Sequence, residues 1–173
     1  MTSTYSPGRR TLAAMAIISL AIAMGGCSPG SPAPGDHGHE HGELPYEWSA
    51  ECELRPGRYT LVFSEARHDS SILVAFLGET GEREGMDHLA QHVMEAAAED
   101  VPAGGSLLVK DQHAYNLEID PEGTTFTLEV LEAGRYVIYT EHFAWEFDMR
   151  ILADDGTEVE MENPREHAEP HEH

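Results

Sequence analysis

Positive charge and cysteine are both scarce in this sequence. The 173 residues include 32 acidic but only 10 basic side chains, of which Lys110 is the single lysine, and the formal net charge is −22. Such a field repels nucleic acid and anionic membrane surfaces, and it attracts cations. We therefore expect no nucleic-acid partner and look for cation sites first.

Sequence motifs of the common enzyme classes are also absent. The chain has no Gly-x-Ser-x-Gly elbow, no phosphate-binding loop and no dinucleotide fingerprint. Pairs of glutamate and histidine do occur, but a chain this acidic produces such pairs by chance. We therefore predict that the protein is not an enzyme.

The first residues have the features of an export signal. Arg9 and Arg10 precede an apolar run, Leu12–Met24, which is too short for a transmembrane helix and leads into Gly-Gly-Cys27. This ending resembles the lipobox of bacterial lipoproteins. The resemblance implies cleavage before Cys27 and a lipid on its sulfur. Because Ser28 follows, it also implies a place in the cell envelope at the periplasmic face of the outer membrane. A plain secreted protein cleaved nearby is the alternative.

We divide the chain into four parts. Residues 1–26 are the signal peptide, 27–44 a flexible His-rich tether, 45–162 one folded domain, and 163–173 a His-rich C-terminal tail. The 147 residues left after cleavage suffice for one domain of ordinary size. Their net charge is near −24, because the two arginines of the signal are lost. Both tails lack apolar periodicity, so we expect them to be disordered.

The folded part has mostly the pattern of strands. Seven segments of strand length carry alternating or continuous apolar residues between turn residues: Tyr46–Leu54, Arg58–Ser64, Ser71–Leu77, His113–Ile119, Thr124–Leu131, Arg135–Glu141 and Phe143–Leu152. Their spacing predicts an antiparallel β-sandwich. Alternation in the first segment places Cys52 on the buried face, so we interpret it as an inert thiol rather than a nucleophile or ligand.

One segment has helical periodicity instead. Between Glu84 and Asp100, apolar residues recur at the spacing of one helix face: Met86, Leu89, Ala90, Val93 and Ala97. Gly85 lies near the start of this segment and Pro102 follows its end. We predict a helix over Asp87–Glu99, inserted at one end of the sandwich.

A short phrase occurs twice in the folded part. Leu54-x-x-Gly-Arg-Tyr59-x-Leu61 matches Leu131-x-x-Gly-Arg-Tyr136-x-Ile138. In each copy the glycine permits a tight turn, and the tyrosine starts a strand with its ring inward and its hydroxyl near the rim. We interpret the repeat as a structural unit, so only the residues that follow each copy are candidates for chemistry.

The second copy carries a family resemblance. The run from Thr124 through Gly134-Arg135-Tyr136 to Thr140-Glu141-His142 resembles the last two strands of cupredoxin-like domains, whose final strand bears metal ligands at its end. Together with the His-rich tails, the pattern is similar to secreted, His-rich proteins of bacterial metal homeostasis. The resemblance covers about half of the mature chain and implies metal binding. Blue-copper sites need a thiolate, and Thr140 or Glu141 stands where that cysteine would be, so electron transfer is not supported.

Histidines gather in both tails. Six of the 11 lie there: His37, His39, His41, His167, His171 and His173. Imidazole is the commonest protein ligand for borderline metals, so we predict that the tails capture metal. The affinity should be modest, because ordering a loose chain costs ~1–2 kcal/mol per residue. A solvated tail that binds no metal is the alternative.

A second candidate site lies on the predicted helix. His88 and His92 are four residues apart and share one face, opposite the apolar face. Such a pair forms a two-point metal chelate. The alternative is an exposed helix surface with no ligand.

A third candidate site follows the repeated phrase. Glu141 and His142 interrupt a well-patterned strand, which indicates that they face a site, with Glu146 nearby. His68 and Asp69 follow the first copy, and the two loops would meet if the copies occupy related places. A mixed histidine and carboxylate site suits Zn²⁺. The alternative is a rim histidine in a hydrogen bond, and His113 is interpreted as a half-buried core residue.

These patterns together predict an envelope protein that binds, buffers or delivers a divalent transition metal. Zn²⁺ is expected first, with Cu²⁺ or Ni²⁺ as alternatives, and the expected partners are a metal transporter and, through the lipid anchor, the membrane. The four methionines of the mature chain form no cluster, which argues against a Cu⁺ chaperone. A structural or adhesive envelope lipoprotein with incidental histidines is the alternative.

Overall fold

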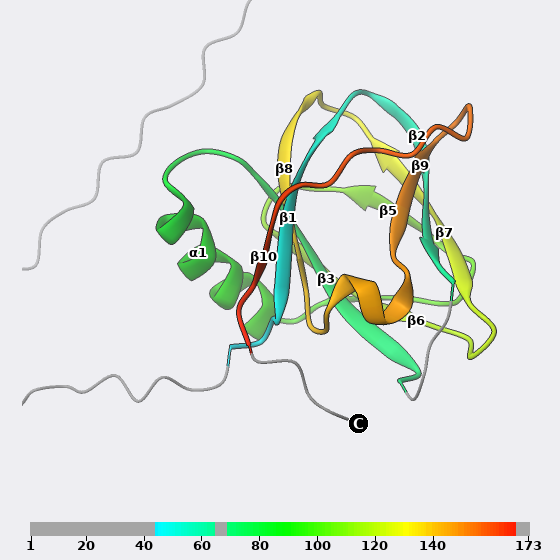
Figure 1. Cartoon of the computed structure of the whole chain (residues 1–173), viewed down its shortest axis with the longest axis horizontal. Helices are drawn as coiled ribbons and strands as arrows, with labels where there is room; N and C mark the ends of the chain where they lie inside the picture. Colours follow the sequence, from blue (N-terminus) through cyan, green and yellow to red (C-terminus); the bar gives the residue numbers. More distant parts are fainter. Residues whose placement is uncertain (1–43, 65–68, 169–173) are drawn as a thin grey trace, which may run out of the picture. The chain divides into compact units, whose positions relative to one another are not determined.

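The described residues form a β-sandwich with one α-helix (Figure 1). The computed structural model describes residues 44–64 and 69–168. In chain order the elements are β1 (Trp48–Leu54), β2 (Gly57–Phe63), β3 (Ser71–Gly78), α1 (Arg83–Glu95), β4 (Glu99–Val101), β5 (Ser106–Val109), β6 (His113–Glu118), β7 (Thr124–Val130), β8 (Gly134–Thr140), the 3₁₀ helix η1 (Ala144–Phe147), β9 (Arg150–Ala153) and β10 (Glu162–Glu166). The predicted mostly-β sandwich with a helical insertion is confirmed.

Two sheets make up the sandwich. One has six strands in the order β10-β1-β8-β3-β6-β4, and the other has four in the order β5-β7-β2-β9. The strand pairs are antiparallel except at two edges, where β4 runs parallel to β6 and β5 runs parallel to β7. Six of the predicted segments correspond to β1, β2, β3, β6, β7 and β8, whereas the short strands β4, β5 and β10 were not predicted.

One apolar cluster fills the space between the sheets. Along β1, Trp48, Ala50, Cys52 and Leu54 alternate into this cluster, and β7 contributes its alternate residues in the same way. Full burial of one large apolar side chain stabilises the fold by ~1.5–3 kcal/mol. Burial also raises the pKa of the Cys52 thiol to about 12, which favours the protonated, less reactive thiol at neutral pH.

Helix α1 packs on the outer face of the six-stranded sheet, not at one end of the sandwich as predicted (Figure 1). Its buried residues Met86, Ala90 and Met94 contact an apolar patch made by Ala75, Leu77, Ala114, Val137 and Tyr139. The helix begins and ends four residues before the predicted Asp87–Glu99. Its end is earlier because Glu99–Val101 pair with β6, and their backbone groups are used in the sheet.

The predicted start of the C-terminal tail, residue 163, is wrong. Glu162–Glu166 form β10, which pairs antiparallel with β1, and the His167 backbone N–H donates to the Glu47 carbonyl at 2.7 Å. All five β10 residues are exposed, so the strand has no apolar alternation that a sequence pattern could reveal. The tail therefore begins after His167.

Charged side chains attach β10 and α1 to the sheet. The Glu51 carboxylate accepts a hydrogen bond from Asn163 Nδ2 at 2.9 Å. It also lies 2.7 Å from Arg135 Nη2 and 2.6 Å from Arg83 Nη1. The hydrogen bonds from Asn163 and Arg135 and the charge of Arg83 hold the pKa of Glu51 below its usual value. Glu51 is thus a charged residue within the sheet that links strand, helix and C-terminus.

The tyrosine of the repeated phrase makes the same contact in both copies. The Tyr59 hydroxyl donates to the Arg55 carbonyl at 3.1 Å, and the Tyr136 hydroxyl donates to the Glu132 carbonyl at 3.0 Å. Each tyrosine therefore ties the strand start to the backbone four residues earlier. The first copy begins β2 in one sheet and the second begins β8 in the other. The repeat is a structural unit, as interpreted from the sequence.

Candidate metal centre

The chain turns sharply after β8, and backbone hydrogen bonds hold this turn. The Glu47 N–H donates to the Thr140 carbonyl at 3.0 Å, and the Glu141 N–H donates to the Leu73 carbonyl at 3.0 Å. The Thr140 hydroxyl donates to the His142 carbonyl at 2.6 Å. His142 therefore lies directly beyond the strand end, with its side chain 31% exposed. Its ring stacks on Phe147, with centroids 5.9 Å apart.

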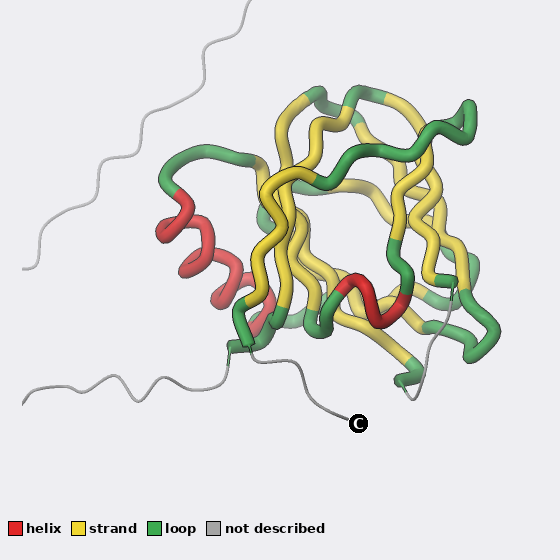
Figure 2. Tube along the Cα trace, viewed as in Figure 1, coloured by secondary structure: helices red, strands yellow, loops and turns green. Residues whose placement is uncertain are grey.

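The segment after His142 forms the 3₁₀ helix η1 where a strand was predicted (Figure 2). Phe143 and Phe147 are buried, but Trp145 is 51% exposed. Strict alternation would have turned Trp145 inward, whereas two buried residues four apart fit one face of a helical turn. Asp148 ends the turn with a φ of 45°. The turn brings the half-buried Glu146 back toward His142.

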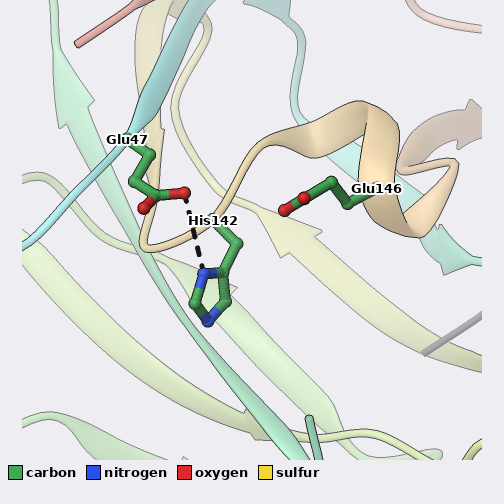
Figure 3. A group of neighbouring side chains, drawn as sticks. All are labelled: Glu47, His142 and Glu146. Carbon is green, nitrogen blue, oxygen red and sulfur yellow. Dashed lines mark ion pairs between the residues drawn. The ribbon is translucent and has the colours of Figure 1, made fainter. Parts of the chain in front are cut away.

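Glu47 is the third member of the group and was not predicted. It directly precedes β1, which pairs with β8 so that Trp48 lies opposite Thr140. Its Oε2 lies 3.7 Å from Nδ1 of His142. Figure 3 shows the carboxylates of Glu47 and Glu146 directed toward His142, whose ring nitrogen faces Glu47. One ligand atom from each residue lies within 4.8 Å of the others. We call these three residues the end site.

Asp69 approaches the other nitrogen of the same imidazole. Its Oδ2 lies 3.9 Å from His142 Nε2, which is an ion-pair distance rather than a hydrogen bond. Asp69 lies between β2 and β3 and His142 follows β8, so one described residue after each copy of the repeat reaches this point, as expected from the sequence. His68, the other residue expected there, lies outside the described residues.

Glu141 does not join the end site, although it was a predicted ligand. Its side chain is turned to β3, where Oε2 accepts a hydrogen bond from the Leu73 N–H at 3.1 Å. The physical reason is that Glu141 directly follows the end of β8 and still lies beside β3, so its neighbours are backbone groups of β3. Among residues 44–64 and 69–168, the end site is the one group of three or more possible ligands that lie this close.

The other predicted histidines have separate surroundings. His88 and His92 are exposed on α1, with their Nε2 atoms 3.2 Å apart. His113 is half-buried, as interpreted, and lies at the start of β6, where its ring contacts Tyr115 and its Nε2 lies 3.1 Å from Glu99 Oε2. The remaining site predictions lie outside the described residues: Cys27, His37, His39, His41, His171 and His173.

His167 belongs to the folded part of the chain, so the prediction of a free tail that includes it was wrong. Its Nε2 lies 2.8 Å from the Ser49 hydroxyl, and its ring packs edge-on against Tyr46 with centroids 4.8 Å apart. Burial lowers the pKa of His167, which favours the neutral ring in this place. Its role in the described structure is to pack the chain end against β1.

The donor set of the end site fits a zinc ion. Zinc is bound by imidazole nitrogen and carboxylate oxygen at about 2.0–2.2 Å, which places ligand atoms of a tetrahedron about 3.3–3.5 Å apart. Ligand atoms already within 4.8 Å therefore need movements of about 1 Å to share one ion. Three protein ligands would leave a fourth position for water or for another donor.

Comparisons with known proteins identify no relative: no family model, curated protein or solved structure matches this chain. The resemblance to cupredoxin-like domains therefore stays a prediction. In the part of the chain that the structure describes, no helix has the length and apolar character needed to cross a bilayer.

Proposed function

We propose that this protein binds a divalent transition metal, zinc first, at the end site. The observation that carries the proposal is the convergence of Glu47 with His142 and Glu146, from two segments distant in the sequence, on one half-buried point. A strand end can pack without two carboxylates beside an imidazole, so packing alone does not explain this group. A net charge of −22 would also raise the local concentration of cations around such a site.

The ligand types select the class of metal. One imidazole with two carboxylates is a donor set for Zn²⁺ rather than for Cu⁺, which prefers thiolate and thioether sulfur. Cys52 is buried in the core, and its thiol is held protonated. Asp69 supports the assignment, because ligating histidines commonly direct their second nitrogen to a carboxylate.

The biological role follows from the sequence rather than from the fold. A protein with a lipid on Cys27 would hold the metal at the cell envelope, on the periplasmic face of the outer membrane, and buffer it or deliver it to a transporter. The predicted His-rich tails would add weaker sites of the same chemistry. No catalytic role is proposed, because the sequence has no motif of a known enzyme class.

Thermal melts of the mature chain with and without Zn²⁺ test this function. An ion that binds only the folded protein stabilises it by ~2.7 kcal/mol at a hundredfold excess over the dissociation constant. Metal held by the tails contributes no such gain if the tails bind it equally well in the unfolded chain. We expect the wild type to gain stability with Zn²⁺ and His142→Ala to lose that gain.

The control is His113→Ala, which removes a half-buried histidine from another part of the sheet and should keep the zinc-dependent gain. A wild type with no zinc-dependent shift, or an equal shift in His142→Ala, would contradict the end site. The first of these results would favour the alternative, a structural or adhesive envelope lipoprotein with incidental histidines.

A further inference from the structure

The two histidines of α1 converge on each other at the protein surface. His88 and His92 lie one helical turn apart, their Nε2 atoms are separated by 3.2 Å, and their ring centroids lie 4.6 Å apart. Both residues are exposed. We call these two residues the helix pair. They lie on α1, outside the set of residues that form the end site.

The separation of the two nitrogens matches that of ligands on one ion. Nitrogen ligands at about 2.0–2.1 Å from a tetrahedral metal are about 3.3–3.4 Å apart. The helix pair is therefore close to a two-point chelate without a change in the backbone. Two neutral imidazoles at this distance can instead share one hydrogen bond, which is the arrangement that a bound ion would replace.

The helix that carries the pair is held firmly in place. Asp87, directly before His88, has its carbonyl bonded by the Tyr46 hydroxyl at 2.9 Å. Its carboxylate accepts bonds from the Tyr139 hydroxyl at 2.8 Å and from Arg165 at 2.9 Å. With Met86 and the other inward residues buried as well, α1 cannot rotate without breaking these contacts. The pair is thus preorganised, which reduces the entropy lost on binding an ion.

We infer that the helix pair is a second metal site, open to solvent, which takes a divalent ion that favours imidazole, Cu²⁺ above all. Two imidazoles without a carboxylate form a softer donor set than the end site, and Cu²⁺ binds nitrogen donors most strongly among the divalent first-row ions. Within the described residues the pair has no third carboxylate or imidazole close enough to complete a group of three. Water fills the remaining positions, so the ion exchanges readily. This inference does not rest on the end site.

Amide hydrogen exchange of α1 in the mature chain, with and without Cu²⁺ at neutral pH, tests the site. An ion that bridges two turns must be released before the helix opens. At a hundredfold excess over the dissociation constant, exchange of the α1 amides should therefore slow by up to about a hundredfold. Only the exchange of the α1 peptides is measured, so Cu²⁺ bound by the tails does not affect the result.

The matched control keeps the number of histidines and moves one of them. In the double variant His92→Gln with Glu95→His, the two imidazoles are two turns apart, about 10 Å along the axis, and cannot share an ion. This variant should show no slowing, whereas His142→Ala should retain all of it. Three results would overturn the inference: unchanged exchange in the wild type, equal slowing in the double variant, or loss of the slowing in His142→Ala. The last would assign the effect to the end site.

Discussion

His142 presents its two ring nitrogens to different carboxylates. Nδ1 faces Glu47 at 3.7 Å and Nε2 faces Asp69 at 3.9 Å. If Nδ1 binds the ion, Nε2–H is directed at Asp69, which fixes the tautomer and increases the basicity of the ligand. Asp69 is then a positioning residue, and Glu47 and Glu146 are the residues that contact the metal.

Neutral variants of the three glutamates near His142 separate ligands from bystanders. Glu47→Gln and Glu146→Gln remove a negative ligand, so each should weaken Zn²⁺ binding by at least about tenfold, the lower end of the losses seen when a supporting residue of a metal site is removed. Glu141→Gln should leave the affinity unchanged, because that side chain is bonded to the Leu73 N–H. Calorimetric titration of the mature chain measures all three, and an equal loss in Glu141→Gln would contradict the assignment.

Two of the three end-site residues were visible in the sequence. His142 stood out because it and Glu141 interrupt an apolar strand pattern, and Glu146 was noted as a polar residue nearby. Glu47 did not stand out, since it is one of four polar residues that alternate with apolar ones along Tyr46–Leu54. Only the pairing of Trp48 with Thr140 brings it beside His142. Contacts between strands distant in sequence depend on register, and one sequence contains no direct record of register.

Among the elements, β10 is unusual because charge rather than apolar burial attaches it. All five of its residues are exposed. Asn163 bonds Glu51, and Glu162 Oε2 lies 2.5 Å from Arg135 Nη2. Arg165 reaches Asp87 on α1. The strand is therefore held through a network centred on Glu51, and its attachment should depend on the ionisation of that carboxylate.

Acid should weaken the fold through Glu51 in a defined pH range. Its folded pKa lies below the usual value of 4.5, so the unfolded chain binds more protons as the pH falls past 4.5. The stabilisation is complete above about pH 4.5 and is lost as the pH falls through the folded pKa. At pH 7, Glu51→Gln should lose about 1–3 kcal/mol of unfolding free energy. This deficit should shrink in acid, as measured by urea unfolding from pH 7 to pH 3.

Glu99→Gln is the matched control for that series. Hydrogen bonds from Lys110 and His113 also lower the pKa of Glu99, but its side chain is 51% exposed, so solvent screens its interactions. The unfolding curve of this variant should stay close to wild type at every pH. If the loss of unfolding free energy in Glu51→Gln did not change with pH, the shape of the Glu51 side chain, and not its charge, would attach β10.

The elements that sequence patterns revealed are those that bury apolar side chains. Six strands with alternating or continuous apolar residues were predicted close to their observed bounds. The strands β4 and β5 are only three and four residues long, and β10 buries nothing, so none has a usable pattern. At η1 the pattern was present but ambiguous, because Phe143 and Phe147 are in phase with both a strand and a helical turn.

At the scale of the whole molecule, the tails and the folded domain should be separable. Deleting residues 36–41 and 169–173 removes five of the tail histidines and should reduce the number of Zn²⁺ sites in a calorimetric titration. The melting temperature of the metal-free protein should stay nearly unchanged. A deletion that begins at Arg165 should lower it, because that cut also removes the His167 contacts with Ser49 and Tyr46. An unaltered site count after the shorter deletions would show that the tails bind no zinc.

The polar character of β10 also bears on how copies of the protein behave when crowded together. An edge strand offers unpaired backbone groups to any neighbouring chain, and aggregation by strand addition begins at such edges. On the β10 side, Pro164 has no N–H to donate, and Glu162, Arg165 and Glu166 are exposed charges. At the opposite edge, β4 is three residues long and begins with Glu99 and Asp100. Both edges of the larger sheet thus discourage intermolecular pairing at high protein concentration.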